Sequence, residues 1–247
     1  MALIKTKKQL TEIKTAGKIL SAVFDTVAPA VKQGASLIEL DNIIHQTITS
    51  NQCRPSFLNY EGFPKSSCIS VNDQVIHSIP DEYQLNDGDI LTIDIGLWYN
   101  KVCVDSARTY SVGKIDEKAR NLIKYTAEAL EKGISQAVSG NHIGAISDAI
   151  ERVAKKHHFG IVRNYTGHGV GLAVHEEPSV PNIGKITDGI VLKPGMVLAI
   201  EPMFTLGGGE VLTMPNGWTV VTADGSLAAQ FEHTIIVTNG NPIITTK

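Results

Sequence analysis

Four acidic residues of the chain stand among apolar neighbours, where an ionised carboxylate is unfavourable. Asp94, Asp105, Glu201 and Glu232 lie in the stretches ILTIDIG, VCVDSA, VLAIEP and QFEHTII. Buried carboxylates are normally paired, protonated or bound to a cation, and only Arg108 lies close to any of the four in the sequence. Taken singly, each acid could instead end a strand or accept a local hydrogen bond. Taken together, the four acids indicate a shared cation.

A histidine in the stretch GHGVGLAVHEEP, residues 167–178, adds a nitrogen donor to this set. His168 and four carboxylates form an oxygen-rich group with one imidazole, which suits Mn, Fe, Co or Zn better than a thiolate-binding metal. Four carboxylates are enough for two ions, and such pairs lie about 3.5–4 Å apart with a bridging hydroxide that attacks a carbonyl or phosphoryl centre.

The elements that must position these residues occur twice in the chain. LNDGDILTID (residues 85–94) aligns without gaps on LKPGMVLAIE (residues 192–201), and QGASLIELDNII (residues 33–44) aligns on SGNHIGAISDAI (residues 139–150) at nearly the same offset. The second pair of segments keeps the 3-4 spacing of an amphipathic helix. In the first pair, a turn with glycine leads into an apolar strand that ends in a carboxylate.

This repeat predicts two similar halves, about residues 1–115 and 116–247, packed as one catalytic domain over residues 1–247. Each half would place helices first and β-hairpins afterwards, which gives an α+β fold with helices on one side of a curved, largely antiparallel sheet. Related halves around a pseudo-twofold axis would bring Asp94 and Glu201 toward one central site. A hairpin would set Asp94 and Asp105 side by side.

Composition excludes several classes of protein. The chain has 43% hydrophobic and 19% charged residues and a net charge of −3, which is typical of a soluble globular protein and argues against one built to bind nucleic acid. No stretch approaches the roughly 20 apolar residues of a membrane span, and no secretory signal begins the chain. Three cysteines without CxxC spacing predict neither a disulfide framework nor a cysteine zinc site. We therefore expect a cytoplasmic protein.

The sequence resembles the type I methionine aminopeptidases, in the short form without an amino-terminal zinc-binding extension. The resemblance covers nearly the whole chain, through NYEGFPKSSCISVNDQVIHSIP, the GHGVG…HEEP block, LKPGMVLAIEP and the order of the five predicted ligands. It implies the pita-bread (creatinase/aminopeptidase) fold, in which two α+β halves enclose a dinuclear metal site. It also implies a monomer that removes the initiator methionine from nascent chains when the second residue is small. A metal-bridging hydroxide would perform the attack, and a transient contact with the ribosome would follow from the substrate.

Carried over residue by residue, the resemblance implies that Asp94 binds one metal and that Asp105 and Glu232 bridge both. His168 and Glu201 would complete the other metal, and Glu201 would also act as general base. The cofactors would be two divalent ions of Co, Mn, Fe or Zn.

The resemblance also assigns residues that contact the substrate. His77 would lie near the leaving peptide nitrogen, and His175 would bind the substrate carbonyl and stabilise the oxyanion. Considered alone, His77 could equally be a buried structural histidine, but its place in HSIP, which echoes HEEP, favours catalysis. The methionine side chain would contact Phe57, Tyr60, Phe63, Cys68 and Trp218.

Two departures from the family pattern lead us to expect differences. Val174 stands where relatives often carry an aromatic residue, which predicts a different pocket shape, and Cys103 precedes Asp105 on the same strand face, which predicts altered metal preference or sensitivity to oxidation. A proline-specific aminopeptidase or dipeptidase of the same fold is the second interpretation, although such enzymes usually add an amino-terminal domain. A non-enzymatic pita-bread binding module is the third, and such modules typically lose metal ligands.

Overall fold

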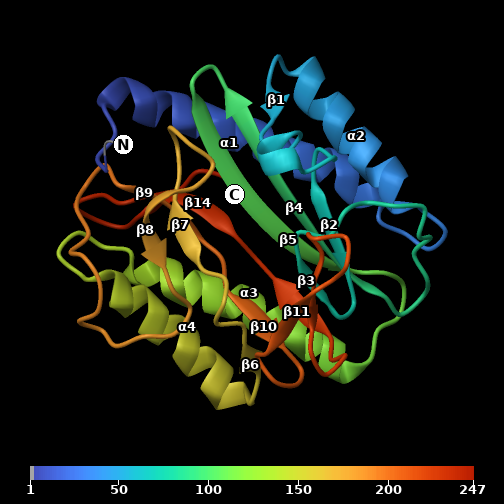
Figure 1. Cartoon of the computed structure of the whole chain (residues 1–247). Helices are drawn as coiled ribbons and strands as arrows, with labels where there is room; N and C mark the ends of the chain where they lie inside the picture. The colour runs from blue at the N-terminus through green and yellow to red at the C-terminus, as the bar shows by residue number, and fades with distance from the viewer. Residues whose placement is uncertain (1–2) are drawn as a thin grey trace.

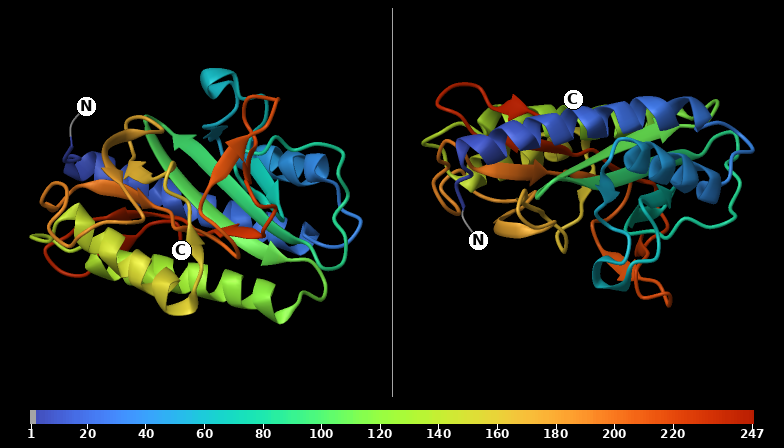
Figure 2. Two further views of the ribbon diagram at one scale, coloured as in Figure 1. Left: turned by 60° about the horizontal axis from the view of Figure 1, so that its bottom comes forward. Right: turned by 90° about the horizontal axis from the view of Figure 1, so that it is seen from above.

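The chain combines helices and antiparallel strands, which confirms the predicted α+β class. The computed structural model describes residues 3–247. The helical elements are α1 (Lys7–Val27), η1 (Ala28–Ala30), α2 (Leu37–Ser50), η2 (Tyr60–Gly62), α3 (Glu117–Gln136) and α4 (Ile143–His157). Seen from above, α1 covers one side of the strands, whereas η2 and β11 project on the opposite side (Figures 1 and 2).

The first three α-helices begin at residues whose side chains cap free backbone N–H groups. Thr6 and Gln9 form a capping box at the start of α1, and Ser36 and Glu39 form another at the start of α2. Asp116 accepts a hydrogen bond from a backbone N–H in the first turn of α3. Each helix then buries one apolar face, which docks it against its neighbours.

The strands pair antiparallel throughout residues 3–247 and form four sheets. They are β1 (Arg54–Pro55), β2 (Cys68–Val71), β3 (Gln74–Ile76), β4 (Ile90–Tyr99), β5 (Val102–Ser111), β6 (Gly160–Ile161), β7 (Gly167–Gly169), β8 (Glu176–Val180), β9 (Val197–Ile200), β10 (Met203–Thr205), β11 (Val211–Thr213), β12 (Val220–Thr222), β13 (Ala228–Gln230), β14 (His233–Ile236) and β15 (Ile243–Ile244). Two sheets matter most for the site: β1-β4-β2 with β5 on β4, and β15-β14-β9-β7-β8.

The long hairpin of β4 and β5 corrects two details of the sequence analysis. Asp94 lies inside β4, which continues to Tyr99, so this strand does not end at its carboxylate. In the register of the hairpin, Asp94 pairs with Ala107 and Asp105 pairs with Gly96. Asp94 and Asp105 are therefore diagonal neighbours on one face of the hairpin instead of direct partners, because β4 runs on past Asp94 before the chain turns.

A seam between β5 and the segment leading into β14 joins these two sheets. The Glu232 N–H donates to the Ala107 carbonyl at 2.8 Å, and the Ala107 N–H donates to the Glu232 carbonyl at 3.4 Å. The Thr234 hydroxyl donates to the Asp105 carbonyl at 2.7 Å and accepts from the Asp105 N–H at 2.9 Å. The seam thus places Asp105 beside Glu232, although they are far apart in the sequence.

The division of the chain into two similar halves stays a prediction. α2 and α4 begin at Leu37 and Ile143, which the sequence repeat aligns with each other. One cluster of buried apolar side chains lies among α1, α2, β4 and β5, and a second lies among α3, α4, β9 and β14. No helix within residues 3–247 is both long enough and apolar enough to cross a membrane.

Candidate active site

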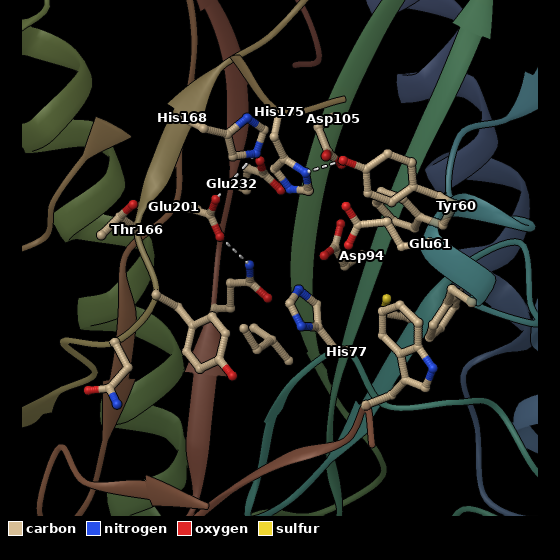
Figure 3. Close-up of a pocket in the computed structure, with 18 residues that line it drawn as sticks. Tyr60, Glu61, His77, Asp94, Asp105, Thr166, His168, His175, Glu201 and Glu232 are labelled. Carbon is tan, nitrogen blue, oxygen red and sulfur yellow. Dashed lines mark hydrogen bonds and ion pairs between the residues drawn. The ribbon is translucent and has the colours of Figure 1, made fainter. Parts of the chain in front are cut away.

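One cavity of about 310 Å³ collects every residue that the sequence analysis assigned to catalysis, metal binding or substrate binding. Its lining includes Asp94, Asp105, His168, Glu201 and Glu232, the histidines His77 and His175, and Phe57, Tyr60, Phe63, Cys68 and Trp218. Figure 3 shows the labelled acids and histidines converging on a common space from different strands. The roles of the individual residues stay predictions.

Three neighbouring strands bring the second group of predicted ligands together. β9 lies between β7 and β14, so His168 in β7, Glu201 just after β9 and Glu232 just before β14 face one another. Ligand atoms of Asp105, His168 and Glu232 all lie within 4.8 Å of one another. The Oε1 atom of Glu201 lies 3.6 Å from Nε2 of His168.

The tautomer of His168 is set by its own strand. Its Nδ1 lies 2.8 Å from the carbonyl oxygen of Gly169, so Nδ1 carries the hydrogen and donates it. This leaves the lone pair on Nε2, on the side of Glu201. Burial and, to a smaller extent, the nearby His175 lower the pKa of His168 to about 3, so the ring is neutral at pH 7. A neutral imidazole with a free Nε2 lone pair is the form that binds metals.

The acids of the cavity carry strongly perturbed pKa values. Burial raises the pKa of Asp94, Glu201 and Glu232 well above the ordinary range, and the negative charge of Asp105 raises all three further. Burial also raises the pKa of Asp105, to about 7, against the opposing effect of hydrogen bonds from Asp94 and from the N–H of Ser106. These carboxylates need positive charge to be ionised together.

The side chains that the structure describes around the cavity supply no such charge. Within residues 3–247, no lysine or arginine lines the cavity. Arg108 lies on the opposite face of β5, with its guanidinium 4.4 Å from the centre of the Phe24 ring. Oδ1 of Asp94 and Oε1 of Glu232 are buried without a hydrogen-bond partner. An oxygen-rich set with unpaired, buried oxygens and one free imidazole nitrogen fits divalent cations.

The two remaining histidines stand at the edge of this acidic group. Burial and, to a smaller extent, the nearby His175 lower the pKa of His77 to about 4, so His77 is neutral at pH 7. His77 has a φ of +55°, a conformation that is strained for a non-glycine residue and is often found at functional sites. The Nδ1 atom of His175 lies 3.1 Å from the hydroxyl of Tyr60, and the His175 ring centre lies 4.4 Å from that of His168. Both histidines can exchange hydrogen bonds with a ligand in the cavity.

Aromatic and sulfur-containing side chains form the other wall. Phe63 and Trp218 meet edge to face, with ring centres 5.2 Å apart. Cys68 pairs with Asp94 across β2 and β4, and burial raises the pKa of its thiol well above the usual range, so the sulfur stays protonated. This wall can take a short apolar side chain while the acidic group lies next to it.

Several lining residues were missed by the sequence analysis. Gln230 is almost fully buried, and its Nε2 donates to Oε2 of Glu201 at 3.0 Å. Glu61 and Tyr165 also line the cavity, and the Tyr165 ring meets His77 edge to face. Gln230 lies two residues before Glu232 in the segment AAQFEHTII, so both side chains are expected on the same face of an extended strand. This spacing could have identified Gln230 as a neighbour of the site.

The two departures from the family pattern lie outside the cavity lining. Val174 is 2% exposed and belongs to the apolar cluster around α1 and β4, so it does not line the cavity itself, and its effect on the pocket shape stays a prediction. Cys103 is fully buried in the same cluster. Burial raises the pKa of its thiol well above the usual range, and this makes Cys103 a poor nucleophile.

Comparisons with known proteins agree with this geometry. The model of metallopeptidase family M24 matches residues 11–239. A methionine aminopeptidase of Clostridium perfringens is 45% identical over 246 residues, which are 99% of each chain. Methionine aminopeptidase 1 of Bacillus subtilis is 43% identical over 238 residues, 96% of each chain.

Solved structures are similar over the whole chain. The crystal structure of methionine aminopeptidase from Rickettsia prowazekii has a TM-score of 0.98 and 40% identity, and each chain is covered completely. A prolidase from Pyrococcus furiosus has a TM-score of 0.80 at 24% identity, over 99% of this chain and 65% of its own. The second likeness shows the shared fold alone. It agrees with the predicted pita-bread architecture.

Proposed function

Because the chain belongs to metallopeptidase family M24, we propose that it is a metal-dependent aminopeptidase that removes the initiator methionine when the second residue is small. One observation carries this proposal: four acidic side chains and His168 share a single cavity with an apolar, sulfur-containing wall. The nearly full-length relatives named methionine aminopeptidase support the choice of methionine.

Two divalent ions of Mn, Fe, Co or Zn are the proposed cofactors. The residues that would hold them are Asp94, Asp105, His168, Glu201 and Glu232. When bound, such ions activate water and polarise the scissile carbonyl. The buried, unpaired oxygens of Asp94 and Glu232 support this assignment.

The protein's own side chains handle the protons and the substrate. Glu201 accepts the proton of the attacking water, and Gln230 fixes the orientation of its carboxylate. His175 donates a hydrogen bond to the substrate carbonyl, because the Tyr60 hydroxyl engages its Nδ1 and leaves Nε2 for the substrate. His77 lies near the leaving nitrogen.

The apolar wall of the cavity and its small volume determine the substrate specificity. The methionine side chain lies against Phe57, Tyr60, Phe63, Cys68 and Trp218, where a thioether makes favourable contacts with aromatic rings. The volume of about 310 Å³ is at the small end for ligand sites, which supports the exclusion of a bulky second residue.

The other two interpretations are less well supported. The prolidase from Pyrococcus furiosus is only 24% identical and shares the fold alone. A non-enzymatic binding module has no need for four acids and a histidine in one cavity with buried, unpaired oxygens. We expect no nucleic-acid specificity, because the net charge is −3.

The cellular setting follows from the substrate. Nascent polypeptides present their amino termini at the ribosome, so a transient ribosome contact, a cytoplasmic location and a monomeric enzyme are proposed together. Residues 1–247 would act as one catalytic domain built from two related halves.

The test uses purified protein that has been stripped of metal by chelation. Hydrolysis of a Met-Ala-Ser peptide should disappear and return on addition of Mn, Co or Fe. A panel of Met-Ala, Met-Leu, Leu-Ala and Ala-Pro peptides then measures specificity, and Met-Ala should be cleaved fastest. Activity that survives chelation would contradict the metal mechanism, and preference for Ala-Pro would favour the proline-specific alternative.

A further inference from the structure

The segment before α1 contributes a lysine to a buried ion pair, which lies next to the loop that carries His175. Nζ of Lys5 lies 2.7 Å from Oε2 of Glu176, and the two side chains are only 1% and 2% exposed. Glu176 directly follows His175, whereas Lys5 is 171 residues from Glu176 in the sequence. A single buried ion pair therefore ties the start of the described chain to the neighbour of a proposed catalytic histidine.

Glu176 also holds the backbone of this loop. Its second oxygen, Oε1, accepts hydrogen bonds from the N–H groups of Leu172 and Ala173, the latter at 3.1 Å. The loop closes tightly, because the Gly171 N–H donates to the Ala173 carbonyl at 3.2 Å. Both carboxylate oxygens are thus engaged, one by the ammonium and one by the loop. Glu176 therefore links the Lys5 side chain to the backbone of residues 172 and 173.

Lys5 is itself held in place and fills the space under the loop. Its backbone N–H donates to the Gly195 carbonyl at 2.9 Å, and the next residue, Thr6, caps α1. A Cβ atom at Gly171 would come within 2.9 Å of Cε of Lys5, and Gly171 has a φ of +131° that favours glycine. The Lys5 stem therefore packs directly against the loop backbone.

Net stability does not explain this ion pair, because the desolvation of two buried charges largely offsets their attraction. The ion pair instead fixes the orientation of the Glu176 carboxylate, since charge-assisted hydrogen bonds are short and have narrow geometric requirements. On its cavity side, His175 contacts the Tyr60 hydroxyl at 3.1 Å. The orientation of the His175 ring depends on the backbone of this loop, which Glu176 holds through its hydrogen bonds.

We propose that Lys5 is a positioning residue that acts through Glu176 to fix the orientation of His175, so that the docked amino-terminal segment completes the active site. The inference rests on the proposed aminopeptidase function, because that function gives His175 its contact with the substrate carbonyl. Neither Lys5 nor Glu176 lines the cavity that holds the predicted metal ligands.

The test begins with Lys5→Met, which keeps an apolar stem and removes the charge. In the Mn-loaded enzyme with a Met-Ala-Ser peptide, kcat should fall by about tenfold or more while KM changes by less than about threefold, since misplacement of a catalytic group mainly affects the chemical step. Metal affinity, measured by calorimetry with Mn(II) alone, should be unchanged. Lys8→Met and Glu177→Gln, which alter exposed neighbours, should leave kcat unchanged.

A double-mutant cycle separates positioning from general damage. In a His175→Ala background, Lys5→Met should lower kcat by less than about twofold, because both changes remove the same interaction. In the Zn-loaded wild type, the ¹⁵N chemical shifts of the His175 ring should report one tautomer, and Lys5→Met should shift them toward a mixture. Full additivity of the two losses, or unchanged kcat and unchanged His175 shifts in Lys5→Met, would overturn the proposal.

If Lys5→Met does not fold, Lys5→Met/Glu176→Gln replaces it, since this variant leaves no uncompensated charge and keeps an acceptor for the loop, and the same loss of kcat is expected. If the wild type cleaves no peptide, the proposed function fails, and the His175 shifts still decide whether Lys5 orients the ring.

Discussion

Replacing Asp105 by asparagine should make the metal-free protein more stable at pH 8, although Asp105 lies in the proposed metal site. The side chain is 3% exposed, and burial raises its pKa from 3.8 to about 7. At about 1.36 kcal/mol per pKa unit, this rise opposes folding by about 4 kcal/mol at pH 8. Because the folded-state pKa is the higher one, the penalty is absent below about pH 4 and grows until about pH 8.

Asparagine removes this penalty and keeps an oxygen for the Ser106 N–H, which donates to Oδ1 of Asp105 at 3.0 Å. Its amide hydrogens can lack acceptors, which costs about 1–3 kcal/mol, so we expect a net gain of about 1–3 kcal/mol at pH 8. At pH 5.5 the advantage should shrink, because only about half of the ionisation penalty remains. Added Mn(II) should reverse the order, since the wild type binds metal more tightly and is stabilised more by it.

The assay is urea unfolding followed by circular dichroism, in EDTA, at pH 8 and pH 5.5, and then with Mn(II). Glu131→Gln, on the exposed surface of α3, is the control and should stay within about 0.5 kcal/mol of the wild type. The reasoning is wrong if metal-free Asp105→Asn is less stable than the wild type at pH 8, or if its advantage does not depend on pH.

Two further variants test the histidines. Tyr60→Phe removes the hydroxyl that lies 3.1 Å from Nδ1 of His175; a hydrogen bond of about 0.5–1.5 kcal/mol predicts a fall in kcat of about two- to tenfold, measured by steady-state kinetics, and an unchanged kcat would show that this contact does not set the tautomer. His77→Ala should lower kcat by roughly 10²-fold or more while calorimetry with Mn(II) finds unchanged affinity; weaker metal binding would mean that His77 is a ligand.

Local sequence context was sufficient to single out the acidic residues that line the cavity. Asp94, Asp105, Glu201 and Glu232 were recognisable because each interrupts an apolar run, and all four line the same cavity. The internal repeat predicted helices followed by hairpins, and these elements occur in that order. Such signals depend only on residues that are close in the sequence, so they can be recognised without knowledge of the tertiary contacts.

Contacts between distant segments could not be found in the same way. The diagonal offset of Asp94 and Asp105 depends on where the hairpin turns, and the hydrogen bond between Gln230 and Glu201 depends on how two sheets meet. The ion pair of Lys5 and Glu176 joins segments that are 171 residues apart in the sequence, and nothing near Lys5 in the sequence indicates this partner. Register and docking geometry, which residue types do not encode locally, decide all three.

The seam between Ala107 and Glu232 has a consequence for how the molecule acquires its activity during synthesis. Asp94 and Asp105 leave the ribosome first, whereas Glu232 leaves it much later and reaches them only when β14 and the segment before it dock on β5. Pairing across such a sequence distance is slow compared with hairpin closure. High metal affinity should therefore arise only when this seam forms, and truncated chains released before β14 should neither retain metal firmly nor process other chains.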